Sequence, residues 1–252
     1  MHRSMARFAS SRILITGAAS GIGAAAAQLL AEQGAGLILM DRDPEGLVAF
    51  PEAAHIIGDV ADPALWVDAD LLGLTHALIN AGVGAGGPIE DMSLDEWRRV
   101  MSVNLDGAFL SLQAAMRAIR ATGKGGAIVV TASAAGIKPE PGIAAYAASK
   151  AAVIQLARVA AKEGAAAGIR VNAIAPGGVE TAIWSSQPFF QELVAAQGGN
   201  EEAAYRALAS AGTPLRRFAK PEEIAAQIAF LLSDDCAFTT GSVLVSDGGY
   251  SL

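Results

Sequence analysis

Residues 16–23 read Thr16-Gly17-Ala18-Ala19-Ser20-Gly21-Ile22-Gly23, and they follow the apolar run 13–15. The alanine-rich stretch 23–33 comes next and has the composition of a helix. A glycine-rich turn between a buried strand and a helix lets the backbone approach a pyrophosphate, and the helix N-terminus offers unpaired N–H groups. The turn therefore predicts a dinucleotide site formed by Gly17, Ser20, Gly21, Ile22 and Gly23.

Short apolar runs alternate with longer alanine-rich stretches along the rest of the chain. The further runs are 37–40, 77–79, 127–130, 169–174 and 243–245, and the further helix candidates are 94–121, 144–163 and 221–232. Continuous apolar runs are typical of strands that are buried on both faces. The alternation predicts an α/β fold, a Rossmann-type doubly wound parallel sheet with helices on both faces, in a single domain spanning 1–252.

Composition excludes several classes of protein. The chain has 252 residues, 52% of them hydrophobic, and a net charge of −7, which disfavours nucleic-acid binding. No apolar run of roughly 18 residues or more is free of charges and helix breakers, so we expect no membrane partner. Cys236 is the only cysteine, so an internal disulfide is excluded and a cytoplasmic location is expected. The histidines His2, His55 and His76 lack ligand spacing, and no metal site is expected.

Asp41 ends the second apolar run, 20 residues after Gly21. A carboxylate at this place can accept both hydroxyls of the adenosine ribose and would repel a 2′-phosphate, which favours NAD as the cofactor. Arg42 follows it, and an arginine at that edge could pair with a 2′-phosphate. NADP therefore stays open as the alternative cofactor.

Tyr146 and Lys150 are four residues apart in the helix candidate 144–163, so they share one helix face. A free tyrosine has a pKa near 10 and is a weak base at neutral pH. A neighbouring ammonium and a positively charged nicotinamide ring would favour the phenolate. This pair is a candidate for proton transfer and for cofactor contact.

Taken together, TGAASGIG at 16–23, Asn80-Ala81-Gly82, Asn104, Ser133 and Tyr146-Ala-Ala-Ser-Lys150 resemble the short-chain dehydrogenase/reductase family in its compact single-domain branch. The resemblance runs from about Arg12 to Tyr250. It implies an NAD-dependent oxidoreductase that transfers hydride between the nicotinamide and a secondary alcohol or its ketone. A small-molecule alcohol or ketone would be the substrate.

The resemblance also implies roles for four catalytic residues: Asn104, Ser133, Tyr146 and Lys150. Tyr146 would be the general acid in ketone reduction and the general base in alcohol oxidation. Lys150 would hold the nicotinamide ribose and lower the pKa of the tyrosine, and Ser133 would bind the substrate oxygen. Asn104 would fix a water that relays protons to the lysine; asparagine is a poor choice by propensity within the helix candidate 94–121.

Further cofactor contacts are implied in the same way. Asp59 and Val60, after the third strand, would touch the adenine. The loop Asn80-Ala81-Gly82 would support the adenosine ribose and the sheet. The nicotinamide carboxamide would be held by Pro176, Gly177, Val179 and Thr181. The stretch from Asp41 to Ile79 is short for the family, so the helices flanking the third strand should be trimmed.

The region 182–217 interrupts the strand–helix alternation and is expected to form a substrate lid over the carboxyl ends of the strands. Val83, Ala134, Ile137 and Glu140 should line the pocket with it. Its aromatic residues Trp184, Phe189 and Phe190 indicate either an apolar or ring-bearing substrate or an anchor that joins the lid to the body.

Two other functions stay open from the sequence. One is an NADPH-dependent reductase of 3-oxoacyl thioesters, which Asp41 disfavours. The other is a regulatory protein that binds a dinucleotide without turnover, which the complete set of four catalytic residues disfavours. The resemblance further implies a homo-oligomer, a tetramer or dimer formed through the helices near 94–121 and 144–163.

Overall fold

In the computed structural model, which describes residues 7–185 and 187–252, seven parallel strands form one sheet. Their order across the sheet is β3-β2-β1-β4-β5-β6-β7. The strands are β1 (Arg12–Thr16), β2 (Gly36–Asp41), β3 (Ala54–Ile57), β4 (His76–Ile79), β5 (Gly126–Thr131), β6 (Ile169–Pro176) and β7 (Val243–Ser246). From β1 to β3 the chain adds strands toward one edge of the sheet, and from β4 to β7 it adds them toward the other edge. A ligand crevice is therefore expected at this switch point, above the carboxyl ends of β1 and β4.

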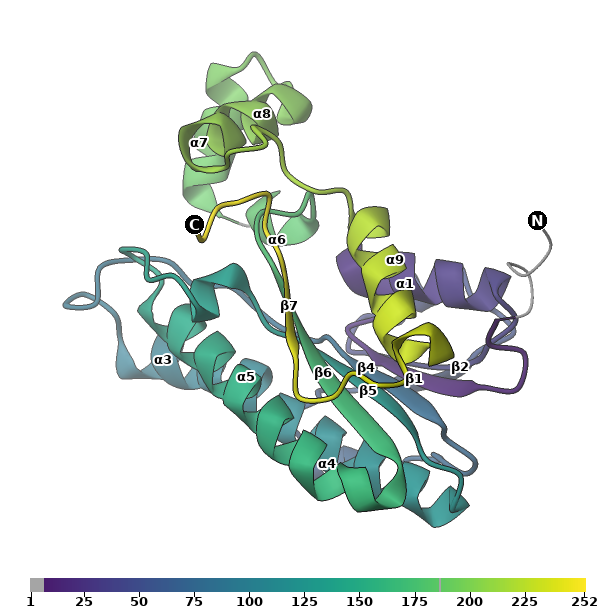
Figure 1. Ribbon diagram of the computed structural model, residues 1–252. Helices are drawn as coiled ribbons and strands as arrows, with labels where there is room; N and C mark the ends of the chain where they lie inside the picture. The colour runs from purple at the N-terminus through teal and green to yellow at the C-terminus, as the bar shows by residue number, and fades with distance from the viewer. Residues whose placement is uncertain (1–6, 186) are drawn as a thin grey trace.

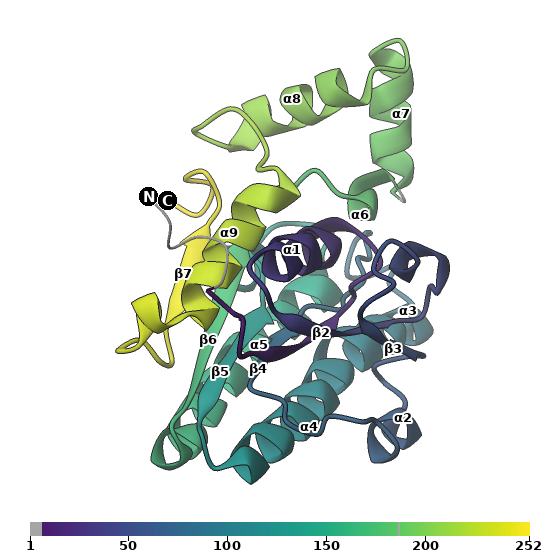
Figure 2. The ribbon, with the colours of Figure 1, turned by 90° about the vertical axis from the view of Figure 1, so that its right-hand side faces the viewer.

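Helices cover both faces of the sheet, which confirms the doubly wound α/β fold (Figure 2). One face carries α1 (Gly21–Glu32) and α9 (Pro221–Leu232), and the other carries α4 (Gly107–Thr122) and α5 (Ala144–Gly164). Strand residues alternate between these layers: Val129 packs on the α1–α9 side and Val130 on the α4–α5 side, both almost completely buried. The small side chains of Ala26 and Ala229 let α1 and α9 lie close together.

The segment between β2 and β4 is reduced, as expected. It contains a 3₁₀ turn (Glu45–Leu47), the edge strand β3 and the single-turn helix α2 (Pro63–Val67). Strand β3 is largely exposed, so it lacks the continuous apolar run that marks β1, β2, β4 and β5.

The single helix expected over 94–121 is divided into three parts. Helix α3 (Leu94–Met101) passes into a π-helical turn (Ser102–Asp106), and α4 follows. A π turn inserts an extra residue into the helical ladder and is frequent at functional sites. Asn104 lies in this turn, which explains why a residue of low helix propensity occupies the middle of the stretch.

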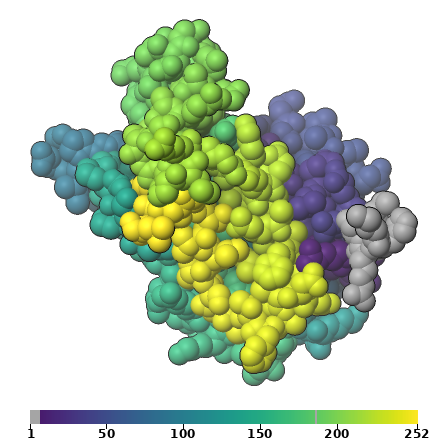
Figure 3. Space-filling model, turned by 45° about the horizontal axis from the view of Figure 1, so that its top comes forward, coloured from purple at the N-terminus to yellow at the C-terminus, as the bar shows by residue number. Residues whose placement is uncertain are grey.

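Helices α6 (Ala182–Ser185), α7 (Pro188–Ala196) and α8 (Glu201–Gly212) project from the carboxyl edge of the sheet (Figure 1). They form the lid segment, residues 182–217, of which residue 186 lies outside the described part. In the space-filling view the lid segment stands out from the body, and the C-terminal residues lie at its base (Figure 3). None of the described helices is long and apolar enough to cross a membrane.

Candidate active site

The glycine turn lies at the carboxyl end of β1 and is packed against the loop after β4. Gly17 has a φ of +67°, and a Cβ there would lie 2.8 Å from the Cα of Ala81. A Cβ on Gly23 would lie 1.9 Å from the Gly17 carbonyl oxygen. Asn80 donates a hydrogen bond from Nδ2 to that same oxygen at 3.2 Å. The turn therefore requires glycine at both positions, and Asn80 holds it to the sheet.

The N-terminus of α1 opens on this turn. Ser20 precedes the helix without forming a side-chain cap, and the first turn contains no acidic residue. The backbone N–H groups at Gly21 and Ile22 and the positive end of the helix dipole are therefore suited to an anion. A dinucleotide pyrophosphate fits the chemistry of this helix end.

Asp41 is joined to the glycine turn through its carboxylate. Oδ2 accepts a hydrogen bond from the Ala19 amide at 2.9 Å, and Oδ1 accepts one from the Asp43 amide at 3.1 Å. Asp41 is half-buried, whereas the adjacent Arg42 is exposed. The structure thus brings Asp41 next to the glycine turn through Ala19, a residue that the sequence did not single out, and the contact of Asp41 with the adenosine ribose stays a prediction.

Asp59 and Val60 follow β3 and differ in what they offer a ligand. Asp59 is exposed, and its Oδ1 accepts a hydrogen bond from the Ala61 amide at 2.9 Å. The Val60 side chain is 5% exposed and packs against Gly107, where a Cβ would lie 2.6 Å from it. Only Asp59 and the Val60 backbone are therefore available for the adenine contact that the resemblance implies.

Tyr146, Lys150 and Ser133 meet at the carboxyl end of β5. Tyr146 and Lys150 lie one turn apart on α5, and the Lys150 Nζ is 5.7 Å from the centre of the Tyr146 ring. Nζ donates a hydrogen bond to the Thr131 carbonyl oxygen at 2.9 Å. Ser133 lies two residues further on, in extended backbone, where Oγ accepts from the Ala135 amide at 3.2 Å. Three of the four candidate catalytic side chains thus share one site.

Burial sets the proton affinities of this group. It lowers the pKa of Lys150 to about 8, because the charged ammonium is removed from water. Burial also raises the pKa of Tyr146, and a hydrogen bond with Ser133 opposes that rise. In this structure the contact that lowers the pKa of Tyr146 is the hydrogen bond with Ser133. The resemblance implies that Lys150 lowers this pKa as well.

Asn104 is buried and connects the π turn to the loop after β4. Oδ1 accepts from the Val83 amide at 2.8 Å, and Nδ2 donates to the Val83 carbonyl at 3.0 Å and to Ser149 Oγ at 3.1 Å. Ser149 in turn donates to the Tyr146 carbonyl at 2.7 Å. The Asn104 side chain is thus a clamp on this loop. Ser149 was not singled out in the sequence, although its position three residues after Tyr146 places it near the same face of the helix.

Gly82 lies between Asn104 and Lys150. A Cβ at this position would lie 3.3 Å from both Asn104 Oδ1 and Lys150 Nζ. The loop Asn80-Ala81-Gly82 therefore contacts the glycine turn at one end and the catalytic group at the other.

The residues at the end of β6 and after it contact Ser133, the C-terminal segment and the start of α1. The Gly177 amide donates to the Ser246 carbonyl at 3.0 Å, and a Cβ on Gly177 would lie 2.8 Å from the Cα of Asp247. Pro176 ends β6, and its carbonyl accepts from Ser133 Oγ at 3.5 Å. Thr181 lies against the start of α1, since a Cβ on Gly21 would lie 3.1 Å from its methyl carbon.

The lid segment has an aromatic core of its own. Trp184 packs on Phe218 at 5.1 Å between ring centres, and Phe190 packs on Tyr205 at 4.6 Å. Phe190 is completely buried, and Trp184 Nε1 donates to the Val179 carbonyl at 2.9 Å. Trp184 therefore anchors the lid segment to Val179 and Phe218, and Phe190 lies in the core of the lid segment, whereas Phe189 is 50% exposed.

Glu140 meets the C-terminal segment beside the loop that follows Ser133. It pairs with Lys138 at 3.3 Å, and its pKa is lowered by the Tyr250 hydroxyl and by Lys138. Lys138 also donates to the Tyr250 carbonyl at 3.0 Å. The contacts among Lys138, Glu140 and Tyr250 therefore hold the C-terminal segment next to the expected substrate pocket.

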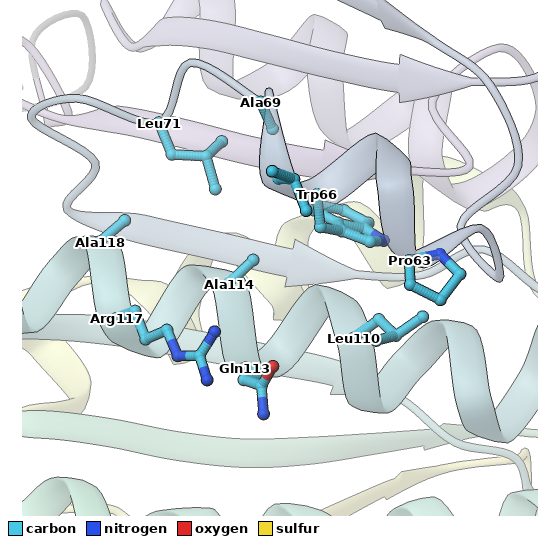
Figure 4. A pocket seen from close by; sticks show the side chains of 10 residues that line it. Pro63, Trp66, Ala69, Leu71, Leu110, Gln113, Ala114, Arg117 and Ala118 are labelled. Carbon is cyan, nitrogen blue, oxygen red and sulfur yellow. The ribbon is translucent and has the colours of Figure 1, made fainter.

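A surface hollow of about 530 Å³ lies elsewhere, between α2 and α4 (Figure 4). Apolar groups such as Trp66, Leu110 and Ala114 line it together with Arg117. None of the candidate catalytic or cofactor residues lines this hollow.

The parallel sheet, the glycine turn and the Tyr146–Lys150–Ser133 group define a dinucleotide-binding oxidoreductase. Residues 17–251 match the family model described as enoyl-(acyl carrier protein) reductase. The chain belongs to the short-chain dehydrogenase/reductase family, which confirms the resemblance. It is an oxidoreductase of alcohols and ketones with a nicotinamide dinucleotide cofactor.

Relatives match over nearly the whole chain. The cis-4-hydroxycyclohexanecarboxylate dehydrogenase of Sinomonas cyclohexanicum is 37% identical, over 97% of this chain and 98% of that protein. The cyclohexanol dehydrogenase of Acinetobacter sp. (strain SE19) is 39% identical, over 97% and 96%. The crystal structure of levodione reductase superposes with a TM-score of 0.85 at 34% identity, covering 97% of this chain and 99% of that one.

Proposed function

We propose that this protein catalyses NAD-dependent interconversion of a secondary alcohol and its ketone, with Tyr146 as the general acid and base. The observation that carries the proposal is the meeting of Tyr146, Ser133 and a buried Lys150 at the carboxyl end of β5, beside the loop that contacts the glycine turn. The core of the site thus comes from residues that the sequence alone singled out.

The bound nicotinamide would supply the hydride acceptor or donor. In alcohol oxidation, the C–H bond of the carbinol carbon breaks with its electron pair while Tyr146 takes the hydroxyl proton. In ketone reduction, Tyr146 gives a proton to the carbonyl oxygen. Ser133 would orient that oxygen, and Lys150 would hold the ribose and hold charge near the phenol. Asn104 would keep the loop at Val83 in place, with the water relay to Lys150 as its second role.

Tyr146→Phe tests the assignment. Removal of the phenol proton should reduce turnover about 10²- to 10⁴-fold, while NADH affinity and melting temperature stay near those of the wild type. Tyr205→Phe is the matched control, because the Tyr205 hydroxyl, on α8 of the lid segment, bonds to the backbone carbonyl of Thr181 and to Glu201 and carries no proposed proton. Turnover retained by Tyr146→Phe would overturn the assignment.

The preference for NAD rests on Asp41. Its carboxylate lies against the glycine turn, where a 2′-phosphate would be repelled, whereas Arg42 is exposed and is the group that would favour NADP. Titration with NADH and NADPH, followed by tryptophan fluorescence, should show tighter binding of NADH. Asp41→Ser should reduce the difference between the dissociation constants for NADH and NADPH. Tighter binding of NADPH than of NADH by the wild type would overturn the NAD preference and would show that Arg42, rather than Asp41, decides the choice of cofactor.

For the substrate we propose cyclic secondary alcohols. The support is that two relatives are a cyclohexanol dehydrogenase and a cis-4-hydroxycyclohexanecarboxylate dehydrogenase. The half-exposed apolar side chains of Ile137, after Ser133, and of Phe189, in the lid segment, add to it. A panel should compare cyclohexanol, its 4-carboxylate and an open-chain secondary alcohol. A higher kcat/KM for the open-chain alcohol than for both rings would contradict this substrate class.

The remaining parts of the proposal concern the whole chain. We propose one catalytic domain with the lid segment as its substrate cover, a cytoplasmic location, and a homo-oligomer, tetramer or dimer, formed through α4 and α5. Phe109 on α4 and Val159 on α5 are 45% and 44% exposed, so these helices have apolar surface left to bury. Light scattering of the purified protein tests the oligomer, and a monomer would exclude it.

A further inference from the structure

Thr131 carries a polar atom that the site described so far does not use. Its side-chain oxygen Oγ1 is buried and has no hydrogen-bond partner, and within the described part of the chain only Gln33 Oε1 shares that condition. Thr131 is 8% exposed. A buried hydroxyl without a partner is destabilising, so such an atom in a native protein calls for an explanation.

The direction of this side chain follows from the alternation along β5. Val129 packs on the α1–α9 layer and Val130 on the α4–α5 layer, so Thr131 faces the α1–α9 layer again. Ile79, the last residue of β4, pairs with Val130, and Asn80 follows it directly. Asn80 reaches the glycine turn on that same side of the sheet, through its bond to the Gly17 carbonyl. The Thr131 hydroxyl is therefore on the cofactor side of the sheet.

Thr131 also belongs to the nicotinamide end of this crevice and not to the adenosine end. Its carbonyl oxygen accepts from Lys150 Nζ at 2.9 Å, and Ser133 is two residues away. Asp41 and Asp59, the candidates for the adenosine side, follow β2 and β3 at the far edge of the sheet. The carbonyl oxygen of Thr131 thus contacts Lys150, and its side chain lies on the side of the sheet that carries the glycine turn.

We propose that the Thr131 hydroxyl is a positioning group that hydrogen-bonds the nicotinamide riboside half of the bound dinucleotide. This inference rests on the proposed function. A hydroxyl can donate or accept, so the partner is a polar atom of the riboside or of the carboxamide. The binding of the cofactor would satisfy the group that the protein itself leaves without a partner.

Thr131→Val tests the proposal, because valine has nearly the shape of threonine without the hydroxyl. The dissociation constant for NADH should rise about 2- to 10-fold, the effect of one neutral hydrogen bond. The constant for ADP, which lacks the nicotinamide riboside, should stay unchanged. The melting temperature of the variant without nucleotide should rise, by roughly 2–4 °C, since an unsatisfied buried group is removed. Thr131→Ser keeps the hydroxyl and should bind NADH more tightly than Thr131→Val.

Thr75→Val is the matched control, at the amino end of the neighbouring strand. Thr75 Oγ1 is already bonded to the Arg12 backbone and to His76, so its loss should lower the melting temperature and leave NADH affinity unchanged. Equal NADH affinity in wild type and Thr131→Val would overturn the inference. A lower melting temperature in Thr131→Val would do the same, because the hydroxyl would then have a partner in the free protein. Failure of the wild type to bind NADH would instead overturn the proposed function.

Discussion

The Lys150 ammonium lies 5.7 Å from the centre of the Tyr146 ring and is held there by the Thr131 carbonyl rather than by a carboxylate. No negative charge stabilises the ammonium at that contact, so burial lowers the pKa of Lys150 to about 8. Burial raises the pKa of Tyr146 at the same time. At neutral pH the pair therefore consists of a charged lysine and a protonated phenol, the form that the proposed ketone reduction requires.

The rates of the two directions should depend oppositely on pH. Alcohol oxidation requires the phenolate, so its kcat/KM should rise by up to about tenfold per pH unit through the neutral range. Ketone reduction requires the phenol, so its kcat/KM should stay level there and fall in alkali. Initial rates from pH 6 to about 10 check this. An oxidation rate that does not change with pH would contradict the role of Tyr146 as the base.

Gly23→Ala should abolish cofactor binding. The new methyl group would lie 1.9 Å from the Gly17 carbonyl oxygen, so the turn has to open. Gly36→Ala is the control, because a Cβ at Gly36 in β2 has no neighbour closer than 3.7 Å. We expect NADH to bind to Gly36→Ala as to the wild type and not to Gly23→Ala. Isothermal titration measures both, and binding by Gly23→Ala would show that the turn tolerates a side chain.

Asn104→Ala should destabilise the protein by about 2–4 kcal/mol, because three hydrogen bonds of a buried side chain are lost together. Asp106→Asn, on the exposed end of the same π turn, should change the free energy of unfolding by less than about 0.5 kcal/mol. Urea unfolding followed by circular dichroism provides both values. Equal stability of the two variants would show that the clamp on Val83 contributes little.

His76 should make the protein sensitive to acid. Burial and then Arg170 lower its pKa from 6.5 to about 4, so the unfolded chain binds a proton between these values that the folded protein does not. The free energy of unfolding should therefore fall as the pH drops from 6.5 to 4, by no more than about 3 kcal/mol from this residue.

The comparison of wild type with His76→Phe isolates that contribution. The variant should lose less stability across this pH window, and His55→Gln, at an exposed histidine, should follow the wild type. Melting temperatures at half-unit pH steps provide the measurement. Parallel curves for wild type and His76→Phe would show that carboxylates alone account for the acid sensitivity.

Most of the buried strands and helix α5 could be predicted from the sequence because their signals are local. Continuous apolar runs mark β1, β2, β4 and β5, and Tyr146 and Lys150 share a face by their spacing alone. Strand β3 has no such run, since it is an exposed edge.

Other features depend on contacts between distant segments. The π turn at Asn104 is supported by bonds to Val83 and Ser149, and helix propensity contains no information on them. Glu140 and Tyr250 are brought together only by the fold. A strand threonine such as Thr131 gives no sign in the sequence that its hydroxyl is left without a partner.

The lid segment leaves the body and returns to it at one point. Val179 and Ala219 form a parallel bridge, the Glu180 amide donates to the Ala219 carbonyl at 3.0 Å, and the Ala219 amide donates to Gly178 at 2.9 Å. A segment whose two ends are tied together can change in length at a small entropic cost, because closure entropy grows slowly with loop length. Evolution, or a protein engineer, can therefore exchange the lid segment, residues 182–217, as a cassette and alter the choice of substrate while Thr181 and the proposed cofactor site stay as they are.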